Sequence, residues 1–177
     1  MYRQEIMQQP KWVALAVALG CAVAAGLLGP IAIEVKGEAP LTAQTLLVLL
    51  PPLLFGWEVG FASALLYLLA GGLGLPVFAH FTGGWERFTG TTGGYLLAFP
   101  IAALIIGWMA PSGVRFRFLR SGGLLLLGQI LILSLGMSWQ RNIVPMTQSI
   151  WESIEPLVPG LIIKTAAGTL ILTAIGR

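Results

Sequence analysis

Charge is scarce in this sequence. Of its 177 residues, only 10% are Asp, Glu, Lys or Arg, whereas a soluble domain carries about a quarter. Hydrophobic residues make up 56% of the chain, and the mean hydropathy is +0.87. Polar side chains are too few to cover a water-exposed surface, so an ordinary soluble domain is excluded. The composition instead predicts an integral membrane protein surrounded by the lipid bilayer.

Cysteine and histidine are nearly absent. Cys21 is the single cysteine, so no internal disulfide forms, and His80 is the single histidine. No His or Cys cluster has the spacing of a metal site, and no cofactor motif is present. The glycines near His80 are not followed by Gly-Lys-Ser/Thr, which excludes a P-loop ATPase. No pair of carboxylates lies in the apolar stretches, so no catalytic residues are predicted. The basic residues are scattered, which excludes nucleic acid as a partner.

Long apolar stretches dominate what is present. A spanning helix needs roughly 17–25 mostly apolar residues, and the stretches that approach or reach this length are 12–33, 43–57, 59–74, 93–110, 121–139 and 158–175. They predict an all-α membrane protein with one domain over residues 1–177, a bundle of six transmembrane helices. Pro51 and Pro52 are expected to kink or break the second helix. Glu58 is expected to mark a tight turn after it.

The basic residues predict the orientation of this bundle. With six spans, both termini lie on one side, and that side carries Arg3, Lys11, Arg115, Arg117, Arg120 and Arg177. The other side carries Lys36, Arg87 and Arg141. Because Lys and Arg concentrate in cytoplasmic loops, both termini are expected in the cytoplasm and the chain in the cell membrane. Loops 34–40 and 80–94 and the polar segment 140–156 then face outward, so a ligand pocket is expected on that face.

Two basic residues on the outward side stand out as candidate ligand-binding residues. Lys164 lies inside the sixth apolar stretch, where a charge is costly and by default marks a functional site. The alternative is that Lys164 extends to the headgroups. Arg87 lies in the glycine-rich loop, where an arginine is usually solvated or paired with an acid. Together, the two cations indicate a site for a carboxylate or phosphate.

Aromatic and amide side chains near these cations complete the candidate site. Phe78, Trp85 and Tyr95 can form the wall for an apolar part of a small ligand; the alternative is anchoring at the membrane interface. Gln44 enters an apolar stretch and needs a partner, either another helix or a ligand. The glycines of loop 80–94 permit close approach of the backbone to a ligand.

Alanines recur every four residues on the first helix. Ala14, Ala18 and Ala22 form a smooth stripe, and small residues at this spacing let helices approach closely. The stripe is either packed inside the bundle or contacts a helix of a partner protein.

Three motifs resemble one known family. The runs PLTAQTLLVLL (40–50), YLLAGGLGLPVF (67–78) and GTTGGYLLAF (90–99) resemble BioY, the biotin-specific subunit of energy-coupling factor (ECF) transporters. The resemblance implies a six-helix protein that binds biotin from outside and is not itself an enzyme. It implies a transmembrane coupling subunit, docked on the alanine stripe, and two cytoplasmic ATPase subunits. It also implies that the loop around Trp85 and Arg87 contacts biotin.

The sequence departs from this family at two positions. The last helix of the family often begins Pro-Gly-Asp-x-x-Lys; Pro159, Gly160 and Lys164 match, but Leu161 stands at the Asp position. Thr91 stands where the family usually has proline. Leucine cannot accept a hydrogen bond from the ureido N–H groups of biotin. Either Gln44 replaces the acceptor, or the ligand is another small carboxylate, such as dethiobiotin or lipoate. A membrane scaffold without a ligand is the remaining alternative.

Overall fold

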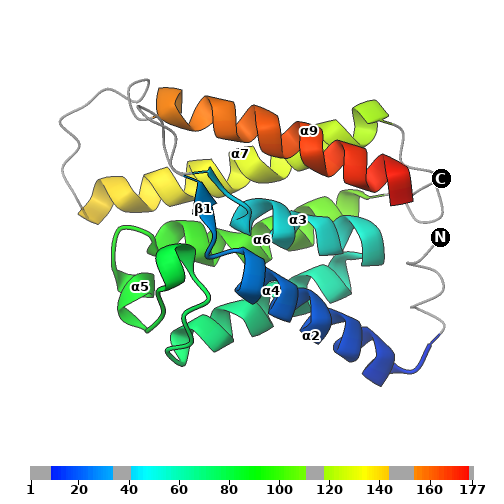
Figure 1. Ribbon diagram of the computed structural model, residues 1–177, viewed down its shortest axis with the longest axis horizontal. Helices are drawn as coiled ribbons and strands as arrows, with labels where there is room; N and C mark the ends of the chain where they lie inside the picture. Colours follow the sequence, from blue (N-terminus) through cyan, green and yellow to red (C-terminus); the bar gives the residue numbers. More distant parts are fainter. Residues whose placement is uncertain (1–8, 34–40, 111–117, 144–153, 176–177) are drawn as a thin grey trace.

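The computed structural model describes residues 9–33, 41–110, 118–143 and 154–175. In these ranges the chain forms one short and six longer α-helices (Figure 1): α2 (Lys11–Leu28), α3 (Gln44–Phe55), α4 (Trp57–Gly72), α5 (Glu86–Thr89), α6 (Gly93–Met109), α7 (Phe118–Ile143) and α9 (Val158–Ile175). Two-residue strands β1 (Ala32–Ile33) and β2 (Leu41–Thr42) pair antiparallel. Single 3-10 turns lie at η1 (Ala79–Phe81) and η2 (Glu155–Leu157).

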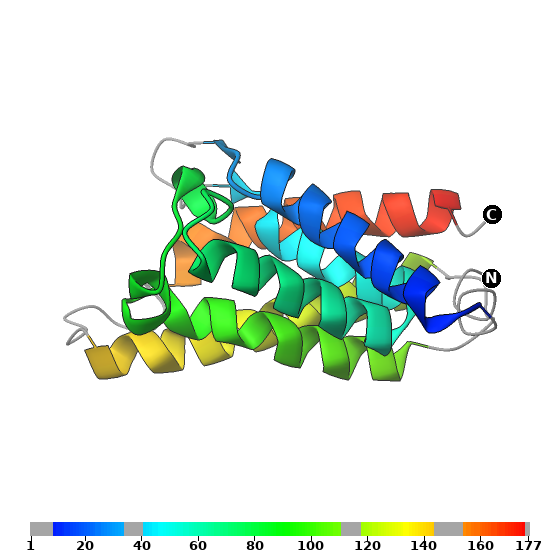
Figure 2. The same ribbon diagram turned by 90° about the horizontal axis from the view of Figure 1, so that it is seen from below.

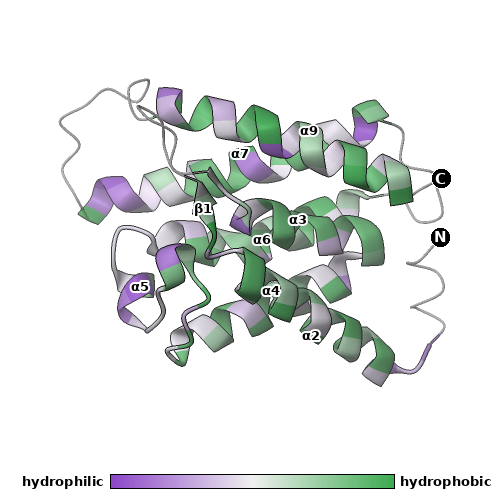
Figure 3. Ribbon diagram, in the orientation of Figure 1, coloured by the Kyte–Doolittle hydropathy of each residue, from purple (hydrophilic) through white to green (hydrophobic). Residues whose placement is uncertain are grey.

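The helices expose an apolar surface. Three helical segments have the length and composition to cross a membrane: Lys11–Leu28, Phe118–Ile143 and Glu155–Ile175. Large apolar side chains on α2 point outward, with Trp12 and Leu27 about 70% exposed. Hydrophobic colour runs along every long helix, and polar colour gathers at α5 and at the ends of α7 and α9 on the same side of the view as α5 (Figure 3). The chain is therefore an all-helical membrane protein, as its composition predicts.

Helix α3 lies at the centre of the bundle. It contacts α2, α4, α6, α7 and α9, and its Leu49 is completely buried. Its 12 residues span only about 18 Å, much less than a bilayer core of about 30 Å. The β2 strand, paired with β1, directly precedes its first residue. This short central helix leaves room for a cavity between the surrounding helices.

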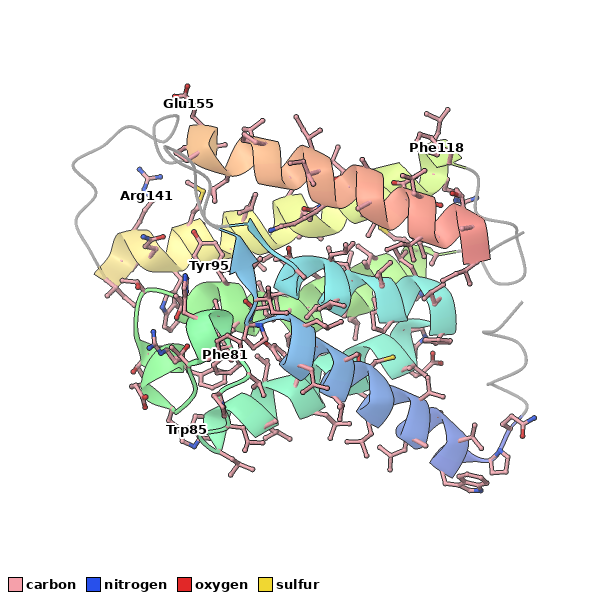
Figure 4. The ribbon with its side chains drawn as sticks, viewed as in Figure 1. Phe81, Trp85, Tyr95, Phe118, Arg141 and Glu155 are labelled. Carbon is pink, nitrogen blue, oxygen red and sulfur yellow. The ribbon has the colours of Figure 1, made fainter. Side chains whose placement is uncertain are left out.

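The two ends of the bundle differ. Helix α2 begins and α9 ends at the same end, where α7 also begins at Phe118 (Figures 1, 2 and 4). The opposite end carries β1, β2, η1 and α5, and is called the cavity end below. Arg141 and Glu155 lie there (Figure 4). Among the described cations, Lys11 and Arg120 belong to the first end, while Arg87 and Arg141 belong to the cavity end. The other residues and loops on which the predicted orientation rests fall in 1–8, 34–40, 111–117, 144–153 and 176–177, outside the described residues.

Several helix ends differ from the prediction. The first helix ends at Leu28 rather than at residue 33, because Pro30 has no N–H for the helical ladder, and Ala32 and Ile33 pair with β2 instead. The predicted turn at Glu58 is wrong: Gly56 turns the chain with φ of 98°, and Glu58 lies in the first turn of α4. The fifth helix is longer than predicted. The sixth has the predicted bounds, 158–175.

The prolines of α3 do not break it. Helix α3 continues through Pro51 and Pro52, and both are buried. A side chain on Gly60 of α4 or on Gly107 of α6 would collide with Pro52. These glycines give the ring its space, so the prolines are part of the packing between α3, α4 and α6. Of the two predicted effects, a kink or a break, the break does not occur.

Candidate functional site

A cavity of about 270 Å³ lies at the cavity end. Its wall is built from the start of α3, the turn around η1, and side chains of α5, α6, α7 and α9. Most of the wall is apolar, as in small-molecule sites, which usually measure roughly 300–1,000 Å³. Of the six predicted binding residues, five line this cavity: Gln44, Phe78, Arg87, Tyr95 and Lys164.

One wall is a tight turn between α4 and α5. Phe78 and Thr82 exchange backbone hydrogen bonds, Phe78 N to Thr82 O at 2.9 Å and Thr82 N to Phe78 O at 3.3 Å. Between them, His80 and Phe81 both have positive φ, 58° and 56°. This left-handed conformation costs a non-glycine residue about 1–2 kcal/mol. His80 N also donates to Pro30 O at 3.2 Å, so the segment just after α2 holds the turn in place.

A chain of hydrogen bonds fixes Gln44. Its Nε2 donates to the Tyr67 hydroxyl at 2.8 Å, and that hydroxyl donates to Val77 O at 2.8 Å. The single Tyr67 proton goes to Val77, so the tyrosine oxygen must accept from Gln44. The side chain of Gln44 is only 7% exposed. Gln44 lines the cavity, and because its Nε2 is bonded to Tyr67, Oε1 is the atom of this amide that can accept a hydrogen bond.

Arg87 and Lys164 bring two positive charges to the same cavity. Arg87 comes from α5 and Lys164 from α9, which lie on either side of the α3 start (Figure 1). Neither forms an ion pair with a described carboxylate, and the Nε of Arg87 is buried without a partner. Burying charge without a partner is unfavourable. A bound carboxylate or phosphate would supply the missing acceptor oxygens.

Aromatic rings support the apolar wall. Phe78 is 3% exposed and packs edge-to-face on Tyr67 and Phe88, with centroids 5.6 and 5.8 Å apart. Tyr95 packs against Gly136 of α7 and donates from its hydroxyl to Gln140 Oε1 at 3.2 Å. These contacts hold two rings of the wall in fixed positions.

Trp85 is the predicted binding residue that does not line the cavity. It is 63% exposed and points outward at the cavity end (Figure 4). Its ring packs on Phe88, with centroids 5.2 Å apart. Trp85 therefore supports the loop from outside, through Phe88.

The wall also contains polar residues that the sequence analysis missed, most notably Thr45. Its Oγ1 is buried and has no hydrogen-bond partner among the described residues. A threonine beside a glutamine at the start of an apolar helix is the signal that could have identified it. Leu161, where the sequence departs from the resembled family, is not among the lining residues, although Leu157 and Lys164 of the same helical segment are.

The alanine stripe of α2 faces mainly into the bundle. Ala18 is fully buried and Ala22 is 7% exposed, so the predicted contact of these two with a partner is not available in this arrangement. Ala14 is half-buried. The opposite face of α2 carries a second small-residue repeat, Ala16, Gly20 and Ala24. Ala16 and Gly20 are exposed and Ala24 is half-buried.

Residues 4–177 match the profile of the BioY family. The chain belongs to the BioY family. Among curated relatives, the probable biotin transporter BioY of Pyrococcus horikoshii is 37% identical over 135 residues, covering 76% of this chain and 79% of the relative. Biotin transporter BioY2 of Lactococcus lactis is 37% identical over 136 residues, covering 76% and 73%. These relatives are named as transporters.

A solved structure has the same fold. It is the S-component for biotin from an ECF-type ABC transporter, with a TM-score of 0.75 to this BioY-family chain. The match covers 93% of this chain and 91% of the other, at 23% sequence identity. At this identity the likeness concerns the arrangement of the helices.

Proposed function

We propose that this BioY-family chain is the biotin-binding S component of an ECF-type vitamin transporter. It captures biotin, and partner ATPase subunits drive import; the chain itself catalyses no reaction. The proposal rests on one observation: the same cavity contains two cations, neither of them paired with a described carboxylate, and an amide that is held by a hydrogen bond and can accept another. Family membership and the names of the curated relatives point to the same ligand.

The polar groups of the cavity suit the two ends of biotin. The carboxylate meets Arg87 and Lys164, which can only donate hydrogen bonds. The ureido N–H groups need an acceptor, and Gln44, which lines the cavity and is held by its Nε2 bond to Tyr67, offers its Oε1. The fused rings lie against Phe78 and Tyr95. Gln44 thereby takes over the acceptor role that leucine at position 161 cannot fill.

In the membrane, all six long helices span the bilayer, and the cavity end faces the outside of the cell. Helices α3, α4 and α6 are shorter than the other three, and α3 contacts all five of the other long helices. Both termini are then cytoplasmic in the cell membrane, as the basic residues predict. The segment from His80 to Tyr95 supplies several wall residues and closes over the bound ligand. Reorientation of the bundle by the coupling subunit then opens the site inward.

The exposed small-residue face of α2 is the docking surface for the coupling subunit. The family resemblance implies docking on small residues of the first helix. A Cβ added at Gly20 would have no other atom within 4 Å, and Ala16, one turn earlier, is exposed. These residues, rather than Ala18, leave space for the backbone of a second helix.

Dethiobiotin is the second candidate ligand, because it keeps both the ureido group and the carboxylate. Lipoate keeps only the carboxylate, and an unused amide acceptor at Gln44 would then remain in the wall. Native mass spectrometry of the purified protein tests these alternatives, after incubation with equimolar biotin, dethiobiotin and lipoate. We expect one biotin per chain. Retention of lipoate alone would contradict the ureido assignment, and no retained ligand would favour a scaffold.

A further inference from the structure

Thr45 Oγ1 differs from most hydroxyls in the helices of this protein. In a helix, Ser and Thr usually donate to a carbonyl of the preceding turn. Hydroxyls on α7 and α9 do so over 2.6–2.8 Å, at Ser138, Thr165, Thr169 and Thr173. Thr45 is the second residue of α3, and the residue four positions earlier, Leu41, lies in β2. Because no helical turn precedes Thr45, its hydroxyl lacks this bond.

Thr45 is placed so that its hydroxyl, which bonds to no described residue, can form a hydrogen bond with a ligand in the cavity. Its Oγ1 is buried and lines the same cavity as Gln44. Leaving a buried hydroxyl without a partner is unfavourable. Arg87 and Lys164 can only donate, whereas the start of α3 offers two neighbouring side-chain acceptors, Gln44 Oε1 and Thr45 Oγ1.

We propose that Thr45 is a specificity-determining residue whose Oγ1 accepts a hydrogen bond from one ureido N–H of biotin, while Gln44 Oε1 accepts from the other. The inference rests on the proposed function and adds a second acceptor to it. A ureido group carries two N–H donors, and the first two residues of α3 offer two acceptors. A carboxylate carries no donor, so this pair places the ureido end at α3 and the carboxylate end at the cations.

Thr45→Val and Thr45→Ser test this assignment. Valine keeps the shape of threonine and removes the hydroxyl, whereas serine keeps the hydroxyl. Biotin and its alcohol analogue biotinol are titrated into each detergent-purified full-length variant by calorimetry, and lipoate is added as a competitor. Thermal unfolding confirms that each variant is folded, and Thr45→Ala replaces Thr45→Val if valine is not accommodated.

We expect Thr45→Val to weaken biotin and biotinol by the same factor, roughly five- to hundredfold, and to reduce the preference for biotin over lipoate. Thr45→Ser should stay close to wild type. The inference is overturned if Thr45→Val binds biotin as wild type does, or if only biotin and not biotinol is affected. Failure of the wild-type chain to bind biotin would instead overturn the proposed function itself.

Discussion

Lys164 provides the sharpest test of how the ligand is oriented. Lys164→Met keeps the length and apolar stem of the side chain and removes the charge. Lys164 is half-buried in α9 and lines the cavity. A hydrogen bond to a charged group contributes about 1.5–3 kcal/mol, so its loss should weaken biotin roughly ten- to hundredfold. Arg87 remains as the second cation, so binding should not be abolished.

The alcohol analogue makes this prediction specific. Biotinol has no charge to lose, so Lys164→Met should change its affinity far less, and the preference of the protein for biotin over biotinol should shrink. Calorimetric titration at constant pH and ionic strength measures both affinities. Arg141→Met is the matched control, because Arg141 is an exposed cation at the same end of the bundle. Equal losses for biotin and biotinol in Lys164→Met would refute the carboxylate contact.

Three further variants test the packing, the hydrogen-bond chain and the docking face. Gly71→Ala should lower the free energy of unfolding by about 1–3 kcal/mol, because the new Cβ collides with the Phe78 ring, whereas the neighbouring Gly72→Ala makes only ordinary contacts. Thermal unfolding in detergent compares the two variants, and equal melting temperatures would contradict the expectation. Tyr67→Phe removes the acceptor that orients Gln44 and should weaken biotin severalfold in calorimetric titration; unchanged affinity would argue against an oriented amide. Gly20→Leu should block co-purification of the coupling subunit without affecting biotin binding. Gly123→Leu should leave the complex intact, although a Cβ at Gly123, like one at Gly20, has no atom within 4 Å. Loss of the complex in both variants would argue against α2 as the docking face.

The sequence predicted the elements of the fold better than their ends. Hydropathy located every long helix, and it placed 158–175 correctly. It cannot separate an apolar strand from an apolar helix, so Ala32 and Ile33 were assigned to the first helix although they pair with β2. Likewise, hydropathy falls after Trp139, but α7 continues to Ile143. There the Trp139 Nε1 donates to Gly90 O at 3.0 Å.

The candidate site was predictable in part, for a physical reason. Charge is so scarce in this chain that Arg87 and Lys164 stood out, and the fold brings them to one cavity. Which face of a helix is buried could not be predicted on α2, because Ala14, Ala18 and Ala22 repeat every four residues just as 16, 20 and 24 do. Thr45 was missed because what distinguishes it is a hydrogen bond that its buried hydroxyl does not make with the described residues, and a sequence does not show hydrogen bonds.

The central claim is that the cavity at the start of α3 binds biotin through its two cations. Equilibrium titration of the detergent-purified chain with biotin tests it most directly, alongside the double variant Arg87→Met/Lys164→Met. We expect one saturable site per chain in the wild type, and a loss of at least a hundredfold in the double variant. Binding weaker than about millimolar in the wild type, or undiminished binding in the double variant, would contradict it.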